Sequence, residues 1–337
     1  MSKAYYRPII ASESLGSEVL AGGWARFAEV EILRRGAMPE RVPTDAIPSE
    51  VLERFIRARE SVASLDLCRP NLMGILNVTP DSFSDGGLFL DADAALGQAR
   101  RILIDGADIL DVGGESTRPG AEDVRVEDEI SRTAPVIEAL RRSGQSVPIS
   151  IDTRKTAVAE AALEAGAGLI NDVAALTFDP DLAAFAAQKS VPVCLMHAQG
   201  TPKTMQQDPV YENVLLDVYD FLEERVVGAQ KHGISRNRIL VDPGIGFGKT
   251  VAHNLALLRG ISLFHGLGCG ILLGASRKRF IGALTGADVA ADRLPGSVTV
   301  ALEGVRQGVQ VLRVHDVRET KQALLIWQAL NGQGAQT

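Results

Sequence analysis

From about residue 71 onward, short apolar segments alternate with longer amphipathic ones. The short segments contain residues that favour strands, and they predict strands over 72–77, 108–113, 149–152, 169–172, 193–197, 239–242, 271–276 and 311–315. The longer segments have apolar residues at helical spacing, and they predict helices over 91–105, 126–142, 155–165, 211–231, 254–262, 293–307 and 318–330. This alternation is typical of βα units around a parallel sheet.

The number of predicted strands selects the architecture. Eight parallel strands close a TIM (β/α)8 barrel, and the repeating part spans roughly 260 residues, the typical size of that fold. A doubly wound sheet usually needs fewer strands. We therefore predict an α/β fold with a barrel over residues 71–331, an N-terminal extension over residues 1–70 and a polar tail over residues 332–337.

The extension lacks the βα rhythm. Prolines interrupt it at positions 39, 43 and 48, and the apolar positions that follow predict one amphipathic helix, through Val51, Leu52, Phe55, Ile56 and Val62. No motif with recognisable chemistry lies in this segment. We expect it to pack on the barrel or on a partner subunit, and its role stays unknown.

Composition narrows the possible partners and the compartment. The 337 residues contain 35 Lys and Arg against 42 Asp and Glu, a net charge of −7, which argues against a protein that coats nucleic acid. The three cysteines are far apart and form no CxxC pair, so neither a disulfide framework nor a cysteine zinc site is indicated. No apolar segment approaches the roughly 20 residues that cross a bilayer. We expect a cytoplasmic protein with no membrane or nucleic-acid partner.

Polar side chains stand at the end of every predicted strand. Active sites of parallel barrels form at these ends, where the βα loops converge. Helix capping is an equal alternative for Asp172, Ser276 and Asp316 taken singly, but a cap requires no arginine, lysine or histidine. The set is Asn77, Glu115, Thr117, Arg118, Asp152, Asn171, Asp172, His197, Asp242, Ser276, Arg277, Lys278, Arg313 and His315.

The charges of this set indicate two kinds of ligand group. The cationic side chains suit phosphate or pyrophosphate, because a guanidinium presents paired donors to phosphate oxygens. The carboxylates and the carboxamide suit a heterocycle rich in N–H donors, such as an aminopyrimidine or a pterin, with Lys278 donating to a ring carbonyl or nitrogen. The anion group is Arg118, Arg313 and His315, and the heterocycle group is Asp152, Asn171 and Asp242.

Two other motifs carry less weight. The segment DPGIGFGKT at 242–250 fails the P-loop pattern, because proline stands at position 243 where that pattern requires glycine. The five histidines form no HExxH or other close ligand pair, so a zinc hydrolase is not indicated. We expect His232, His253 and His265 on the surface.

Eight segments, in their order and spacing, resemble the dihydropteroate synthase family. They are LMGILNVTPDSFSDGG at 72–87, GADILDVGGESTRPGA at 106–121, SIDTRK at 150–155, INDV at 170–173, LMHAQGTPKTMQ at 195–206, DPGIGFGK at 242–249, GASRKRF at 274–280 and RVHDV at 313–317. The resemblance implies a transferase of folate biosynthesis that joins 6-hydroxymethyl-7,8-dihydropterin pyrophosphate to 4-aminobenzoate with the help of Mg²⁺. It also implies a homodimer, formed through the late helices, and a sulfonamide target.

The same resemblance implies a role for each matching residue. The pterin group would be held by Asp152, Asn171, Met196, Asp242, Phe247 and Lys278. Pyrophosphate would be held by Asn77, Thr117, Arg118, Arg313 and His315, with Asn77 next to the metal. The aminobenzoate pocket would comprise Phe83, Thr117, Arg118, Pro119 and Ser276. The catalytic residues would be Asp152, Lys278, Arg313 and His315.

Three alternatives remain at this point. A pterin-binding methyltransferase would keep the pterin contacts but would not need the loop motifs at 79–87 and 115–121. A non-catalytic pterin-binding paralogue would lack a polar residue at some strand end, and none is missing. An aldolase or isomerase of sugar phosphates would need a Schiff-base lysine or a Glu/His pair, and Lys278 follows its predicted strand instead of lying within it.

Overall fold

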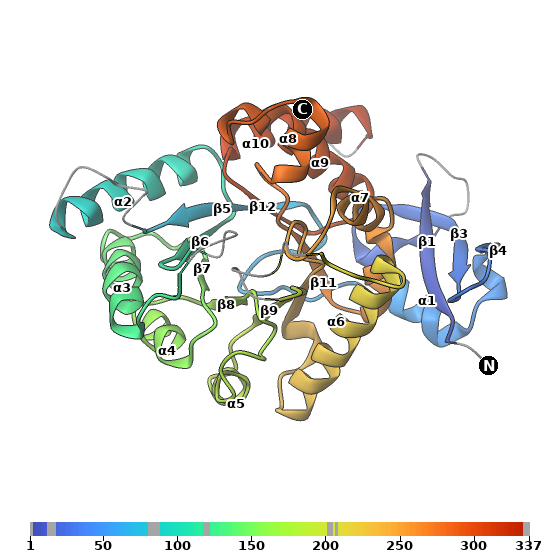
Figure 1. Cartoon of the computed structure of the whole chain (residues 1–337), viewed down its shortest axis with the longest axis horizontal. Helices are drawn as coiled ribbons and strands as arrows, with labels where there is room; N and C mark the ends of the chain where they lie inside the picture. Colours follow the sequence, from blue (N-terminus) through green and yellow to red (C-terminus); the bar gives the residue numbers. More distant parts are fainter. Residues whose placement is uncertain are drawn as a thin grey trace.

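A closed barrel of eight parallel strands forms the centre of the molecule (Figure 1). The computed structural model describes residues 3–11, 18–79, 88–116, 122–200, 205 and 208–332. Neighbouring strands follow the order β5 to β12, and β12 pairs with β5 to close the ring. The strands are β5 (Asn71–Asn77), β6 (Ile109–Gly113), β7 (Ile149–Asp152), β8 (Leu169–Asp172), β9 (Val193–Met196), β10 (Ile239–Asp242), β11 (Gly270–Leu273) and β12 (Val311–Val314). The predicted TIM barrel is confirmed.

Helices surround the barrel on the outside (Figure 1). They are α2 (Leu88–Ile104), α3 (Val126–Arg142), α4 (Thr156–Glu164), α5 (Leu182–Gln188), α6 (Val214–Lys231), α7 (Val251–Arg259), α8 (Arg279–Thr285), α9 (Leu294–Arg306) and α10 (Val317–Leu330), with short 3-10 helices η4 (Arg236–Arg238), η5 (Ile261–Leu267) and η6 (Ala291–Arg293). The predicted helices match seven of these. Helices α5 and α8 were not predicted, because their seven residues are too few to show a helical period.

The extension contains a small antiparallel sheet in addition to the expected helix. Its elements are β1 (Tyr5–Ala11), β2 (Glu18–Val19), η1 (Leu20–Gly22), β3 (Arg26–Leu33), β4 (Glu40–Pro43), η2 (Thr44–Ala46) and α1 (Ser49–Ile56). The predicted helix is correct for α1, but it ends at Ile56, and Val62 lies in a separate bridge with Leu65. The sheet was missed because β3 contains a bulge. Ile9 pairs with Glu29 and Ile10 with Phe27, so Ala28 interrupts the alternation of buried residues.

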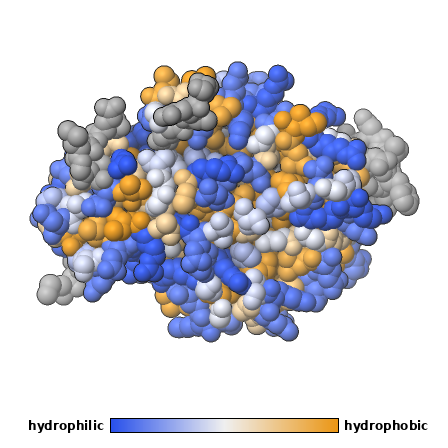
Figure 2. All heavy atoms as spheres, turned by 180° about the vertical axis from the view of Figure 1, so that it is seen from behind, coloured by the Kyte–Doolittle hydropathy of each residue, from blue (hydrophilic) through white to orange (hydrophobic). Residues whose placement is uncertain are grey.

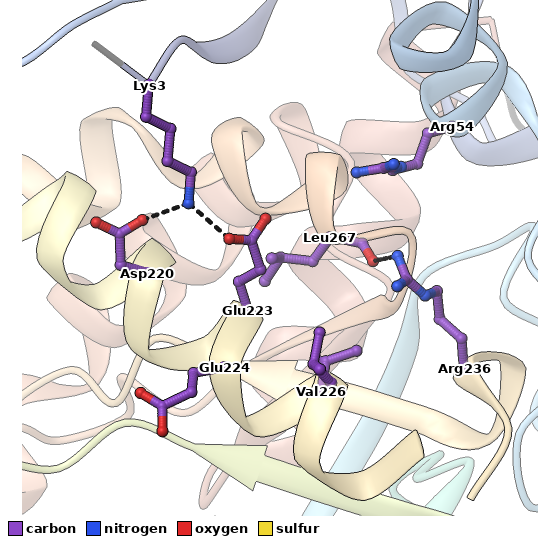
Figure 3. Close-up of a pocket in the computed structure, with 9 residues that line it drawn as sticks. Lys3, Arg54, Asp220, Glu223, Glu224, Val226, Arg236 and Leu267 are labelled. Carbon is purple, nitrogen blue, oxygen red and sulfur yellow. Dashed lines mark hydrogen bonds and ion pairs between the residues drawn. The ribbon is translucent and has the colours of Figure 1, made fainter. Parts of the chain in front are cut away.

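The extension packs on the barrel's flank, next to α6 and η5. Its core places Phe27 edge-on to Phe55, with ring centroids 5.8 Å apart. The Arg59 guanidinium is buried and donates to the carbonyls of Cys269 and His265, beside η5. At the N-terminal end, Lys3 donates to Asp220 and Glu223 of α6 in the wall of a cavity of about 590 Å³ (Figure 3). Contact with the barrel, one of the two expected positions, is therefore observed.

The segment between α1 and β5 seals one end of the barrel. Its side chains Val62, Leu65 and Leu67 are each at most 2% exposed. They pack with residues near the beginnings of the barrel strands, namely Met73, Ile109, Leu169, Cys194, Leu240, Leu272 and Val311. Any polar site of the barrel is therefore left to the opposite end, where the strands finish.

The expected surface position of His265 was wrong. Its side chain is fully buried beside η5, with Nε2 3.1 Å from the carbonyl of Gln307, and burial lowers its pKa to about 3. The extension covers this histidine, which could not be inferred without knowing where residues 1–70 pack. His232 is exposed, as expected, whereas His253 is half-buried. None of the described helices is long and apolar enough to span a bilayer.

Candidate active site

A cavity of about 840 Å³ opens at the carboxyl ends of the barrel strands. The described strand ends and following segments that line it belong to β5, β6, β7, β9, β10, β11 and β12. Seven residues to which the resemblance gives a role line this cavity, namely Asn77, Asp152, Phe247, Ser276, Lys278, Arg313 and His315, and so do Glu115 and Arg277 of the strand-end set. The cavity therefore brings together side chains that are far apart in the sequence.

Strand register places several polar side chains at one level of the barrel. Asn77 pairs with Gly113, Gly113 with Asp152, and Asp152 with Asn171 across four neighbouring strands. Gly113 leaves the middle of this row open. A Cβ atom there would lie 3.5 Å from the Cβ of Asp152 and 3.8 Å from Oδ1 of Asn77. The row therefore presents two oxygen-bearing side chains on either side of a gap.

One guanidinium joins two buried carboxylates, of which one, Asp152, belongs to this row. Nε of Arg313 donates to Oδ2 of Asp111 at 2.6 Å, and Nη2 donates to Oδ2 of Asp152 at 2.7 Å. The Asn171 amide also donates to Oδ2 of Asp111, at 3.1 Å. Asp111 is fully buried, and its Oδ1 atom has no hydrogen-bond partner among the described residues. Arg313, Asp111, Asp152 and Asn171 thus form one network.

Asp111 is a site residue that the sequence interpretation missed. It lies two residues before the end of β6, within a strand that otherwise reads as apolar core. Side chains two apart on a strand point to the same face, so Asp111 shares the barrel-facing side of Gly113. The available signal was an acidic residue inside a fully buried strand, where a charge needs a partner.

The network contains more negative than positive charge. Burial raises the pKa of Asp152; the Arg313 guanidinium opposes that shift and the Asp111 carboxylate adds to it. Two carboxylates thus compete for one guanidinium in a site with little water. Such a site favours ligands that bring N–H donors or positive charge.

Asp242, Lys278 and Phe247 form the neighbouring wall. The Asp242 carboxylate accepts from the backbone N–H of Gly244 at 2.7 Å. Burial raises the pKa of Asp242 to about 6, although the Gly244 hydrogen bond and the nearby Lys278 partly offset this. Lys278 precedes the first residue of α8, and its Nζ atom lies 4.0 Å from the centre of the Phe247 ring. This wall therefore combines an acceptor, a donor and an aromatic face.

Ser276 and His315 contact each other at the cavity edge. Oγ of Ser276 accepts the backbone N–H of His315 at 3.2 Å and lies 3.0 Å from Nδ1 of the same residue. Next to them, Arg277 and Asp316 form an ion pair, with Nε 3.0 Å from Oδ2. Asp316 precedes α10 but makes no side-chain cap. Capping thus does not account for Asp316.

Asp172 supports a turn but does not cap a helix, because α5 begins only at Leu182. Its carboxylate accepts the backbone N–H groups of Ala174 at 2.7 Å and Leu176 at 2.6 Å, so it stabilises the turn after β8. Met196 is the last residue of β9 and His197 follows it, and both are buried, with 3% and 6% of their surface exposed. The predicted site residues Phe83, Thr117, Arg118 and Pro119 lie outside the described residues.

A second buried charge network supports the start of the loop after β6. Arg154 lies 3.0 Å from one Glu115 oxygen and Lys155 lies 3.2 Å from the other. Lys155 also donates to Glu129 and to the carbonyl of Val124, both at 2.6 Å. The predicted polar residue Glu115 is therefore committed to ion pairs that fix the loop's two ends.

No cluster of three His, Cys, Asp or Glu side chains suited to a metal occurs in the described part of the chain. The chemistry of the row at Asn77 nevertheless fits Mg²⁺. Magnesium prefers oxygen ligands, keeps several of its waters, and is usually bound through one or two side chains together with substrate phosphates. The Asn77 carboxamide oxygen and the nearby Asp152 carboxylate provide such donors without a protein cage.

Comparison with known proteins agrees with this geometry. A family model described as pterin binding enzyme matches residues 73–315. The dihydropteroate synthase of Neisseria meningitidis serogroup B is 48% identical over 271 residues, covering 79% of this chain and 94% of the relative. That of Escherichia coli K12 is 45% identical over 266 residues, covering 79% and 93%. The chain belongs to the dihydropteroate synthase family.

The solved structures lead to the same family. Dihydropteroate synthase of Xanthomonas albilineans with 4-aminobenzoic acid has a TM-score of 0.76 and 47% identity, covering 81% of this chain and 97% of that one. As a member of this family the chain is a transferase of folate biosynthesis, as expected. The family model begins at residue 73, so it leaves the extension unmatched.

Proposed function

We propose that the chain condenses 6-hydroxymethyl-7,8-dihydropterin pyrophosphate with 4-aminobenzoate, giving 7,8-dihydropteroate and pyrophosphate, with the site residues in the roles below. The observation that carries the assignment of roles is the buried network of Arg313 with Asp111 and Asp152 at the base of the cavity. An excess of buried carboxylate suits a heterocycle that donates N–H groups and becomes cationic during the reaction.

The pterin ring lies, in this proposal, among Asp152, Asn171, Asp242 and Lys278. Burial raises the pKa of Asp152 and Asp242, so both carboxyl groups gain from accepting N–H donors of an aminopyrimidine. The apolar walls would be Met196 and Phe247. The Clostridium difficile neighbour, 40% identical with a TM-score of 0.73, was solved with pteroic acid, which supports a pterin ligand for this fold.

The pyrophosphate would lie beside Asn77, Arg313 and His315, with Thr117 and Arg118 as further predicted contacts. Bound Mg²⁺, next to Asn77, would neutralise charge on the departing pyrophosphate. As the C–O bond to pyrophosphate breaks, Asp152 stabilises the cationic pterin methylene and Arg313 and His315 hold the anion. Attack by the aromatic amine then forms the C–N bond, the nitrogen releases one proton that the departing pyrophosphate can accept, and no covalent enzyme intermediate is needed.

The aminobenzoate pocket would form around Ser276, with Phe83, Thr117, Arg118 and Pro119 from the two preceding loops. The Xanthomonas albilineans structure contains 4-aminobenzoic acid, and a Yersinia pestis relative with 46% identity and a TM-score of 0.75 was solved with a sulfonamide drug complex. These ligands support an arylamine site that sulfonamides also occupy.

The decisive assay measures pyrophosphate release with Mg²⁺ and the pterin substrate, with and without 4-aminobenzoate. Release that depends on aminobenzoate and yields dihydropteroate supports the proposed reaction. Asp152→Asn should retain pterin binding better than turnover, whereas Arg313→Met should weaken binding of pyrophosphate. Pterin binding without any turnover would refute the reaction and favour a non-catalytic paralogue. Activity that persists after chelation of divalent cations would refute the role of magnesium.

We also propose a homodimer formed through the late helices. Five exposed apolar side chains lie on or beside them, namely Leu284, Val289, Leu325, Ile326 and Leu330, each between 54% and 81% exposed. Figure 2 shows hydrophobic atoms along the upper edge of the molecule, where Figure 1 places α8, α9 and α10. Sedimentation of the wild type and Ile326→Lys tests this: a dimer should become a monomer, and a wild-type monomer refutes the proposal.

We place the reaction in the cytoplasm, and we assign the catalytic machinery to the barrel over residues 71–331. All three cysteines are free, which suits a reducing compartment. The extension over residues 1–70 would support the barrel away from the active site, because its described contacts run to α6, η5 and α9 and to the beginnings of the strands, and none of its described residues lines the cavity. Detection of the protein in an export fraction would refute the first assignment.

A further inference from the structure

Lys249 is a buried lysine at the cavity wall to which the proposed reaction gives no role. It lines the cavity but is only 3% exposed, and it ends the glycine-rich loop that follows β10. A buried lysine is costly unless its donors are satisfied. Its contacts therefore show what the residue stabilises.

The Lys249 ammonium joins the loops that follow β9 and β10. Its Nζ atom lies 2.9 Å from Nδ1 of His197 and 2.9 Å from the carbonyl oxygen of Phe247. Burial lowers the pKa of Lys249 to about 7. In its ammonium form the residue has donors only, so Nδ1 of His197 then accepts, and the neutral ring carries its proton on Nε2. Burial and the charge of Lys249 lower the pKa of His197 to about 2, which agrees with a neutral ring.

The two loops approach each other so closely that only glycine fits between them. Gly244 and Gly248 have φ angles of +67° and +64°. A Cβ atom on Gly244 would lie 1.9 Å from the carbonyl oxygen of His197, and one on Gly248 would lie 2.6 Å from that of Gln199. The loop after β10 is thus fitted to the backbone of the loop after β9, and Lys249 provides a polar link within that contact.

This link ends at the aromatic wall of the pterin pocket. Lys249 donates to the backbone carbonyl of Phe247, whose ring centre lies 4.0 Å from Nζ of Lys278. We propose that Lys249 is a positioning residue for the pterin site: by bonding His197 and the Phe247 carbonyl together, it fixes the Phe247 ring against the Lys278 ammonium. The inference rests on the pterin pocket proposed above.

The variant Lys249→Met keeps the apolar stem and removes the donors. We expect it to bind pteroic acid about tenfold more weakly by isothermal titration calorimetry, the factor that loss of one charge-assisted hydrogen bond supports. In turnover, KM for the pterin substrate should rise by a similar factor while kcat changes by less than about threefold, because Lys249 contacts neither Asp152 nor Arg313. Thermal unfolding checks that the variant is folded.

A double-mutant cycle with Phe247→Leu separates positioning from general stabilisation. If Lys249 acts through the Phe247 ring, Lys249→Met costs about tenfold in the wild-type background and little in the Phe247→Leu background. The matched control is Tyr211→Phe, which removes another bond between the same two loops, from the tyrosine hydroxyl to the Gly248 carbonyl at 2.7 Å. That control should leave pteroic acid affinity within about twofold, because it does not bond Phe247.

Three results would overturn the inference. They are wild-type affinity in Lys249→Met, an equal penalty in the Phe247→Leu background, and an equal penalty in Tyr211→Phe. If Lys249→Met does not fold, Lys249→Gln keeps one neutral donor and should give a smaller loss with the same dependence on Phe247. Failure of the wild type to bind pteroic acid would instead refute the proposed pterin pocket, and the inference with it.

Discussion

Replacing Asp111 by asparagine should shift the pH dependence of the reaction to lower pH. The Asp111 carboxylate is fully buried and shares the Arg313 guanidinium with Asp152, so its negative charge raises the pKa of Asp152. Asparagine has nearly the same shape and keeps an acceptor for Nε of Arg313. The substitution therefore removes a charge while leaving most of the packing in place.

The size of the shift follows from the geometry of the pair. Two carboxylates that accept from one guanidinium have charges about 5 Å apart, and at an effective dielectric constant of about 20 they repel each other by about 3 kcal/mol. That energy corresponds to about two pH units. Because Arg313 and local relaxation reduce the repulsion, we expect the acid limb to move down by at least about one pH unit.

The assay is kcat/KM for the pterin substrate between pH 5 and pH 9, at saturating aminobenzoate. In the proposed mechanism the acid limb reports protonation of Asp152, because its ionised form would stabilise the cationic methylene. The control is Asp108→Asn, which neutralises a carboxylate at the other end of the same strand, where it accepts the N–H of Leu72. An acid limb that stays in place in Asp111→Asn, or moves to higher pH, would refute the electrostatic coupling.

Three further substitutions test interactions that stabilise the fold outside the cavity. Asp172→Ala removes the acceptor of two backbone N–H groups after β8 and should lower the free energy of unfolding by about 3 kcal/mol in urea titrations. Phe55→Ala empties a fully buried ring position in the extension and should cost about 3–5 kcal/mol, measured in the same way. For Asp220, burial raises the pKa, but hydrogen bonds from Lys3, Arg35 and Tyr5 lower it below its usual value. Its stabilisation should therefore be present at pH 6 and be lost progressively as pH falls below about 4, so the difference in urea midpoint between wild type and Asp220→Asn should be smaller at pH 3 than at pH 6.

Each of these three predictions has a result that would contradict it. Wild-type stability in Asp172→Ala would mean that water satisfies the turn without the carboxylate. A cost below about 1 kcal/mol for Phe55→Ala would mean that the extension unfolds separately from the barrel. A difference between wild type and Asp220→Asn that grows toward acid pH would contradict the sign of the linkage.

The barrel could be predicted from sequence because its strands are short and almost entirely buried, with polar residues at their carboxyl ends or within the next three positions. Val126–Arg142 was predicted to the residue, and most strand bounds were right within one or two positions. The extension's sheet could not be predicted, since the bulge at Ala28 disrupts the period of two. Short helices such as Leu182–Gln188 were missed for want of length. Elements whose apolar residues repeat at a regular spacing were thus predictable. Elements with an irregular strand pairing or too few residues to show a period were not.

The ring of strand-end residues was predictable, but its internal bonding was not. The sequence predicts Arg313 near the end of a strand, where its positive charge suits a pyrophosphate ligand. Only the closed barrel shows that its guanidinium is held by Asp111 and Asp152, which lie 202 and 161 residues earlier in the sequence. Lys249 and His197 are a similar case, because their contact depends on how two loops fold against each other.

The two ends of the barrel have opposite physical functions. At one end, Val62, Leu65 and Leu67 exclude water and contribute apolar burial. At the other, Asp111 and Asp152 hold excess negative charge in a poorly solvated site, which disfavours the folded protein without ligand. In the proposed mechanism, a cationic pterin methylene would relieve that repulsion more than the uncharged pterin ring of the bound substrate does, so the same electrostatic cost would become differential stabilisation of the reacting state.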